Sequence, residues 1–268
     1  MYRDFLNYYE LRSVAFNITS NPDFFFESRS HQEAICSLLF GIHERKGIIL
    51  ITGEVGTGKT TLCKALFNKL PAEVKISLIL NPFFSEVQLL KAIAEDFGLK
   101  VRSIELLDII NIINSFLIKL SLNNGNAVLV IDEAQNLTNQ QLEQIRLLSN
   151  LETKDEKLLQ IVLVGQPELK EKISQYNLRQ IYQRIVVKSH LTPLMDYEVK
   201  EYIDFRLGKA GHGNVIIAPE AYRMIYDFSK GIPRLINILC ERAMILGFVR
   251  QQRILTEEIF FNCIEEVR

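Results

Sequence analysis

The chain has 268 residues, of which 48% are hydrophobic and 24% charged, with a formal net charge of −1. This composition is ordinary for a soluble globular protein, and the near-neutral charge gives no general attraction to nucleic acid or to anionic membranes. The four cysteines are widely separated without a CxxC pair, which argues against a zinc cluster. No apolar run approaches the roughly 20 residues of a membrane helix, and the first residues lack the apolar core of a secretory signal.

Five short apolar runs rich in β-branched residues predict strands, and longer helical patterns separate them. Because each run is apolar on both faces, the strands suit the interior of a parallel sheet with right-handed crossovers. The predicted strands are Ile48–Thr52, Val74–Leu80, Ala127–Ile131, Leu159–Val164 and Ile185–Ser189.

Capping signals indicate where the helices between these strands begin. Ser85 with Gln88, and Thr138 with Gln141, each match the pattern of a capping box that opens a helix. A further helix is predicted from about residue 104 to residue 120, before an Asn-Asn-Gly turn.

Pro193 follows the last predicted strand and marks a change of pattern. The sequence beyond it is purely helical, with predicted helices at 196–210, from Pro219, from Pro233 and after Thr256. We therefore expect an α/β domain over residues 1–193, with residues 1–30 as an N-terminal extension, followed by a small helical lid domain over residues 194–268.

The phosphate-binding loop, residues 53–61, reads GEVGTGKTT and matches the pattern GxxxxGK[ST] between an apolar strand and a helix. The glycines let consecutive N–H groups face phosphates, and the helix N-terminus adds partial positive charge. Lys59 is expected to reach the β- and γ-phosphates of ATP, and the Thr60 hydroxyl to bind Mg²⁺. The predicted nucleotide-binding residues are Gly53, Glu54, Val55, Gly56, Thr57, Gly58, Lys59, Thr60 and Thr61.

The segment AVLVIDEAQN places Asp132 and Glu133 at the carboxyl end of a predicted strand, where ligands bind in open α/β sheets. Asp132 is expected to hold Mg²⁺, and Glu133 to orient and deprotonate the attacking water. An acidic pair that merely ends a strand is the alternative interpretation.

Three further polar residues are candidates to assist hydrolysis. Gln166 follows a predicted strand and could contact the water or the γ-phosphate, or could cap the helix that begins at Pro167. Asn81 could hold Glu133 in an inactive pose, or could form an Asn-Pro turn. Arg234 lies in the first turn of a helix, where a cation opposes the helix dipole, and contact with the γ-phosphate would explain that position.

Arg179 and Arg184 precede the last predicted strand in the segment LRQIYQRIVV. Arginines at the rim of a sheet can complete the active site of a neighbouring subunit. Surface salt bridges are the alternative role for both.

Together these segments resemble the AAA+ ATPases of the general secretion pathway protein A (ExeA) type, including the related pilus-biogenesis and exopolysaccharide-locus ATPases. The resemblance covers nearly the whole chain, and its most specific phrases are DEAQNL and RLLSNLET. It implies a P-loop NTPase of the AAA+ type, a three-layer αβα body around a parallel sheet, followed by a helical lid.

The resemblance also implies roles for individual residues. Gln166 would be sensor 1, Arg234 sensor 2 and Arg184 the arginine finger, and the segment around His31 would pack near the adenine. The protein would act as a homo-oligomer, in the form of a ring, on the cytoplasmic side of the bacterial envelope.

Two departures from the family pattern bear on these roles. The family often has a further arginine where Tyr182 stands, so the finger is expected to be Arg179 or Arg184. Longer members continue into a membrane span and a peptidoglycan-binding domain, so this chain is expected to act on the envelope through an inner-membrane partner.

Three functional hypotheses follow. The leading one is an ATPase that drives assembly or remodelling of an envelope machine for secretion, pilus formation or polysaccharide export. The alternative is an ATP-dependent DNA-binding regulator of the transposition or origin-binding type, which the charge-balanced lid sequence does not favour. A scaffold that binds ATP without hydrolysis is the third, and Glu133 argues against it.

Overall fold

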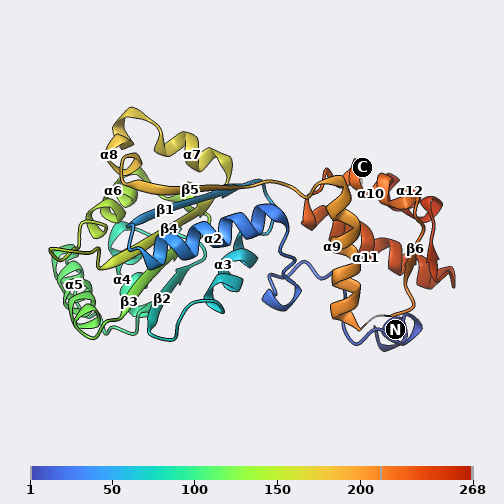
Figure 1. The fold of residues 1–268 in the computed structure, drawn as a ribbon, viewed down its shortest axis with the longest axis horizontal. Coiled ribbons are helices and arrows are strands. Elements are labelled where there is room, and N and C mark those ends of the chain that lie inside the picture. The colour runs from blue at the N-terminus through green and yellow to red at the C-terminus, as the bar shows by residue number, and fades with distance from the viewer. Residues whose placement is uncertain (1, 212, 267–268) are drawn as a thin grey trace. The chain divides into compact units, whose positions relative to one another are not determined.

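The computed structural model describes residues 2–211 and 213–266, and its contacts divide the chain into two units (Figure 1). One unit comprises residues 29–54 and 62–191, and the other comprises residues 1–28, 55–61 and 192–268. The sequence-based division differs from this, because it grouped residues 1–30 and residues 55–61 with the α/β domain. The predicted domain ranges include Met1, His212, Val267 and Arg268, which lie outside the described residues.

The first unit is built on a parallel sheet with the strand order β2-β3-β4-β1-β5. All five predicted strands are present, each within two residues of its expected ends. Apolar β-branched runs favour strands, and β1, β3 and β4 are buried on both faces, whereas β2 and β5 also carry exposed residues. The strands are β1 (Ile48–Gly53), β2 (Val74–Ile79), β3 (Asn126–Ile131), β4 (Leu159–Gly165) and β5 (Ile185–Leu191).

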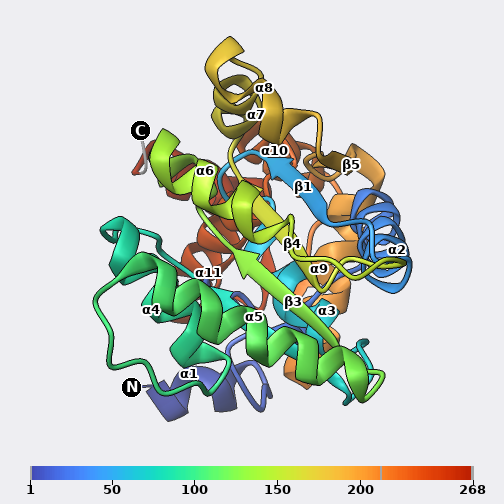
Figure 2. The ribbon, with the colours of Figure 1, turned by 90° about the vertical axis from the view of Figure 1, so that its left-hand side faces the viewer.

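Helices connect these strands and cover the sheet (Figure 2). Both predicted capping boxes are present: the Ser85 hydroxyl accepts from the Gln88 amide, and the Thr138 hydroxyl accepts from the Gln141 amide. The segments are α2 (Arg29–His43), α3 (Lys59–Phe67), α4 (Glu86–Asp96), α5 (Leu106–Leu122), the 3₁₀ turn η2 (Ala134–Asn136), α6 (Asn139–Leu148), α7 (Pro167–Ile173), η3 (Tyr176–Leu178) and α8 (Arg179–Tyr182).

The core of this unit lies mainly on one face of the sheet. Alternate residues of β1, β3 and β4, such as Leu50, Leu129 and Ile161, pack there with the apolar faces of α4, α5, α6 and α7. The opposite face carries Ile49, against which α2 packs so closely that a Cβ on Gly41 would lie 2.6 Å from the Ile49 side chain. The α/β class with a central parallel sheet, predicted from the sequence, is therefore confirmed.

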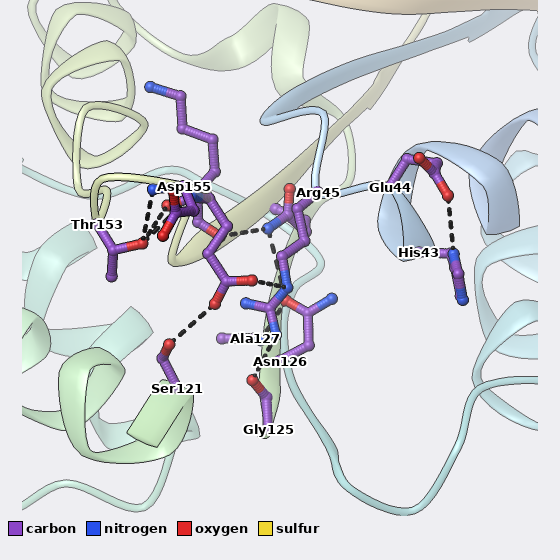
Figure 3. Close-up of polar contacts among 12 residues, drawn as sticks. His43, Glu44, Arg45, Ser121, Gly125, Asn126, Ala127, Thr153 and Asp155 are labelled. Carbon is purple, nitrogen blue, oxygen red and sulfur yellow. Dashed lines mark hydrogen bonds and ion pairs between the residues drawn. The ribbon is translucent and has the colours of Figure 1, made fainter. Parts of the chain in front are cut away.

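Arg45 joins three loops at the amino-terminal edge of the sheet (Figure 3). Its Nη2 donates to the Gly125 carbonyl at 2.9 Å, and its Nε lies 3.2 Å from Glu156 Oε2. The other oxygen of Glu156 accepts from the Ser121 hydroxyl at 3.0 Å. Because the Arg45 side chain is only 17% exposed, water screens these contacts less than it screens contacts at the surface.

The second unit contains the C-terminal helices around a separate apolar core. Its helices are α9 (Asp196–Ala210), α10 (Ala221–Ser229), α11 (Pro233–Val249) and α12 (Glu257–Glu265). The prediction of a purely helical region was wrong in one respect, because β6 (Ile216–Ile217) and β7 (Ile254–Leu255) form a short parallel ladder. Runs of two residues carry no periodicity, so the sequence pattern did not reveal them.

The N-terminal segment, with α1 (Tyr2–Tyr8) and η1 (Pro22–Phe24), packs within this second unit. Tyr9 is fully buried, and its hydroxyl donates to the Met244 carbonyl at 2.8 Å. The buried guanidinium of Arg206 donates to the carbonyls of Ala15 and Asn17 at 2.6 and 3.0 Å. These contacts explain why the segment belongs with the lid helices.

Within residues 2–211 and 213–266, no helix has the length and apolar character that crossing a membrane requires.

We predict that Arg45→Leu lowers the free energy of unfolding by about 1–3 kcal/mol, because the Gly125 carbonyl and the Glu156 carboxylate both lose a shielded partner. Chemical denaturation measures the change. Arg29→Leu is the control, because Arg29 and Glu33 form an ion pair whose side chains are 82% and 68% exposed, and such pairs contribute little. Equal stability of the two variants would contradict the role given to Arg45.

Candidate functional site

The phosphate-binding loop follows β1 and leads into α3, which begins at Lys59. Gly56 and Gly58 have φ values of +84° and +95°, in the left-handed region that glycine adopts without steric cost. These two glycines lie three positions and one position before the helix. They let successive backbone N–H groups turn toward one point, as an anion-binding site requires. The Lys59 side chain is largely buried, at 5% exposure.

Arg234 lies against this loop in the second unit. Its backbone amide donates to the Gly56 carbonyl at 3.2 Å, and a Cβ on Gly56 would lie only 2.7 Å from the Arg234 Cβ. Arg234 is the second residue of α11, and its side chain is exposed. The structure therefore brings a residue predicted from the lid sequence to the phosphate-binding loop.

The strands of the first unit end at a common edge, and the predicted acidic residues stand there. Ile131 pairs with Leu163, and Thr52 pairs with Gly165, so β1, β3 and β4 reach their carboxyl ends side by side. Asp132 follows β3 directly and is 2% exposed. Its backbone amide donates to the Ile79 carbonyl at the end of β2, and its Oδ1 accepts from the Glu133 amide at 2.9 Å.

Glu133 has the left-handed backbone conformation, with φ 51° and ψ 37°. A non-glycine residue held there costs on the order of 1 kcal/mol, and such strain gathers at functional sites. Two amides donate to its Oε2 atom: Gln135 Nε2 at 2.5 Å and Gln166 Nε2 at 3.4 Å. Gln135 was not singled out from the sequence, although it lies within the segment DEAQ, because an amide four residues after a strand has many possible partners.

Gln166 stands at the N-cap position of α7, yet its side chain makes no capping hydrogen bond. The alternative interpretation, that the Gln166 side chain caps the helix, is therefore wrong. Its side chain instead points to Glu133, which β3 brings to the neighbouring strand end.

Asn81 lies after β2, and His31 lies in α2. Asn81 follows β2 and is exposed, and among the described residues it is Gln135 and Gln166, not Asn81, that bond the Glu133 carboxylate. His31 lies in the first turn of α2 and is 4% exposed. The roles of both residues stay predictions.

Arg184 stands at the opposite edge of the sheet from these carboxylates. It directly precedes Ile185, which pairs with Ile48 at the start of β1, whereas Leu191 pairs with Gly53 at its end. Five steps of about 3.3 Å along β1 place roughly 17 Å between the two edges. The Arg184 side chain therefore cannot reach Asp132 or Glu133 at the carboxyl edge of its own sheet.

The neighbours of Arg184 distinguish it from Arg179. The Arg179 guanidinium stacks on the Tyr176 ring, 4.4 Å from its centroid. Arg184 interacts electrostatically with Glu152. The pKa of Glu152 is lowered mainly by its hydrogen bond to Lys157, and the charge of Arg184 lowers it to a lesser degree. Tyr182 has the Lys188 Nζ at 3.7 Å from its ring centroid, and the hydrogen bond to Lys188 lowers the pKa of Tyr182.

Comparison with known sequences adds two findings. Residues 42–173 match the family model described as AAA domain. General secretion pathway protein A of Aeromonas hydrophila is 43% identical over 249 residues, which cover 92% of this chain and 45% of that protein. The chain thus spans less than half the length of this relative.

Comparison with solved structures supports the fold. The ORC2 protein of Aeropyrum pernix, in its ADPNP–ADP complexes, superimposes with a TM-score of 0.69 at 17% identity, covering 90% of this chain and 67% of that chain. Drosophila ORC bound to DNA gives 0.67 at 18% identity, covering 90% and 60%. The RuvB Holliday junction branch migration motor of Thermotoga maritima gives 0.58 at 20% identity, covering 87% and 68%.

We predict that Gly56→Ala abolishes binding of a fluorescent ATP analogue, because a Cβ would combine a positive φ with overlap of the Arg234 Cβ. Gly98→Ala is the matched control, since Gly98 has φ +81° but no atom within 4 Å of the added Cβ. It should lose about 1 kcal/mol of stability at most and keep its affinity. Equal affinity of both variants and the wild type would refute the assignment of the loop.

Proposed function

We propose that this chain, an AAA+ protein homologous to General secretion pathway protein A, binds and hydrolyses ATP with Mg²⁺ to drive assembly or remodelling of a bacterial envelope machine. The observation that carries the ATPase proposal is the Glu133 carboxylate, anchored by two amides at the carboxyl edge of the sheet directly after the buried Asp132. The homology supports the link to secretion, since the relative is named for that pathway.

The residues present suit ATP and Mg²⁺. The loop contributes two left-handed glycines before a helix N-terminus, and Asp132 and Thr60 contribute the oxygen donors that Mg²⁺ prefers. Mg²⁺ held by Asp132 and Thr60 would supply positive charge that offsets the negative charge of the phosphates. Lys59 and the loop N–H groups hold the same phosphates in this proposal.

Glu133 then accepts a proton from the attacking water, and Gln166 orients that water or detects the γ-phosphate. General-base catalysis by a positioned carboxylate contributes about 10²–10⁴-fold to a rate. Arg234, whose backbone already contacts the phosphate-binding loop, extends its guanidinium to the γ-phosphate. Asn81 and His31 retain their proposed roles as a restraint on Glu133 and an adenine neighbour.

Arg184 acts in trans in this proposal, and the working form is a homo-oligomer. The separation of roughly 17 Å between the two edges of the sheet supports this, because an arginine side chain cannot span it. We place the oligomer in the cytoplasm, associated with the inner membrane through a partner protein.

We predict that Glu133→Gln binds ATP with unchanged affinity while its turnover falls by about 10²–10⁴-fold, because the base is lost but the phosphate contacts are kept. Phosphate release, followed over a range of protein concentrations, measures the turnover. Lys59→Ala is the companion variant and should lose ATP binding itself. Undiminished hydrolysis by Glu133→Gln would overturn the ATPase assignment of this site.

We also predict that Arg184→Ala reduces turnover by about 10³-fold or more and inhibits the wild type when the two are mixed, because each finger serves a neighbouring copy. Specific activity of the wild type should rise with protein concentration. Arg179→Ala is the control, since its guanidinium already stacks on Tyr176. Mixed samples with simply averaged activity would refute action in trans.

A further inference from the structure

The side chain of Gln135 joins the Glu133 carboxylate to the start of α7. Its Nε2 donates to Glu133 Oε2 at 2.5 Å, and its Oε1 accepts from the backbone amide of Gln166 at 3.2 Å. The amide therefore uses its donor and its acceptor at once, which determines its orientation. A side chain with only one of the two groups could not form this bridge.

The surroundings of Gln135 hold it in this position. A Cβ on Gly165 would lie 2.7 Å from Gln135 Oε1 and 2.7 Å from the Leu169 side chain, so the last residue of β4 has to be glycine for the bridge to fit. Lys172 of α7 donates to the backbone carbonyls of Gln135, at 3.1 Å, and of Leu137. Burial lowers the pKa of Lys172, as expected for an ammonium withdrawn from water.

Both amides bond the same oxygen of Glu133. Gln135 and Gln166 donate to Oε2, whereas Oε1 receives no hydrogen bond from the residues that the structure describes. The terminal torsion of a glutamate is soft, so an unrestrained carboxylate samples many orientations. Anchoring one oxygen selects an orientation and leaves the other oxygen to accept a proton, which a general base needs.

We propose that Gln135 is a positioning residue for hydrolysis, which holds the Glu133 carboxylate in the orientation in which Oε1 receives the proton of the attacking water. The inference rests on the proposed ATPase function. Gln135 makes no contact with substrate in this proposal and acts only through Glu133. It also ties that orientation to α7, the helix that precedes the segment bearing Arg184.

The test compares Gln135→Met with the wild type by steady-state ATP hydrolysis. Methionine keeps the length and flexibility of the side chain but has neither the amide donor nor the amide acceptor. We expect kcat to fall on the order of 10–100-fold, with KM and ATP affinity within about twofold of the wild type, because only the orientation of the base is lost. Gln140→Met is the control, since Gln140 is exposed on α6 and should leave both constants unchanged.

A second comparison separates positioning from a general structural role. Adding Gln135→Met to Glu133→Gln should not lower the residual single-turnover rate further, because Gln135 then has no base to orient. If Gln135→Met folds poorly by circular dichroism, Gln135→Glu takes its place. It keeps the length and the acceptor but sets a second carboxylate against Glu133, and it should also lower kcat with little change in KM.

Each contrary result has a distinct meaning. Wild-type kcat in folded Gln135→Met, an additive loss in the double variant, or a change confined to KM would overturn this inference, provided that Glu133→Gln still shows its reduced turnover. Absence of turnover in the wild type, or full turnover in Glu133→Gln, would overturn the proposed function and this inference with it.

Discussion

The arrangement of the candidate site depends on one constraint, that parallel strands in register end at the same edge of a sheet. β3 and β4 pair from Ala127 with Leu159 to Ile131 with Leu163, so the residues that follow them are necessarily neighbours. The contact between Glu133 and Gln166, 33 positions apart, follows from this pairing. A shift of register by one residue would turn these side chains to opposite faces and separate them.

The burial of the strands secures that register. β1, β3 and β4 are buried on both faces, so any slip would expose apolar side chains to water or leave cavities. At the far edge, the Arg45 contacts join the loops before β1, β3 and β4. The rigid sheet thus presents its polar residues on short turns, where local strain such as the left-handed Glu133 is tolerated because the surroundings hold it.

The second unit shows the same relation between distant segments. Arg206 of α9 bonds carbonyls of the N-terminal segment, and Arg234 of α11 bonds the phosphate-binding loop. The sequence pattern indicated Arg234 near the phosphates but neither backbone hydrogen bond, because hydrogen bonds to backbone carbonyls demand no particular residue type in the partner. The sequence therefore indicated the helices of this unit but not the packing of residues 1–28 with them.

Local patterns were sufficient for the elements that depend on near neighbours. Strand runs such as Val128–Ile131, the capping box of Thr138 and Gln141, and the glycines of the phosphate-binding loop all act over a few residues, so the sequence by itself determined them. Tertiary structure alone decided that Gln135 bridges Glu133 and α7, and that Arg184 lies at the edge opposite the carboxylates. Those relations depend on strand order and register, which arise from the packing of the whole sheet and have no local signature.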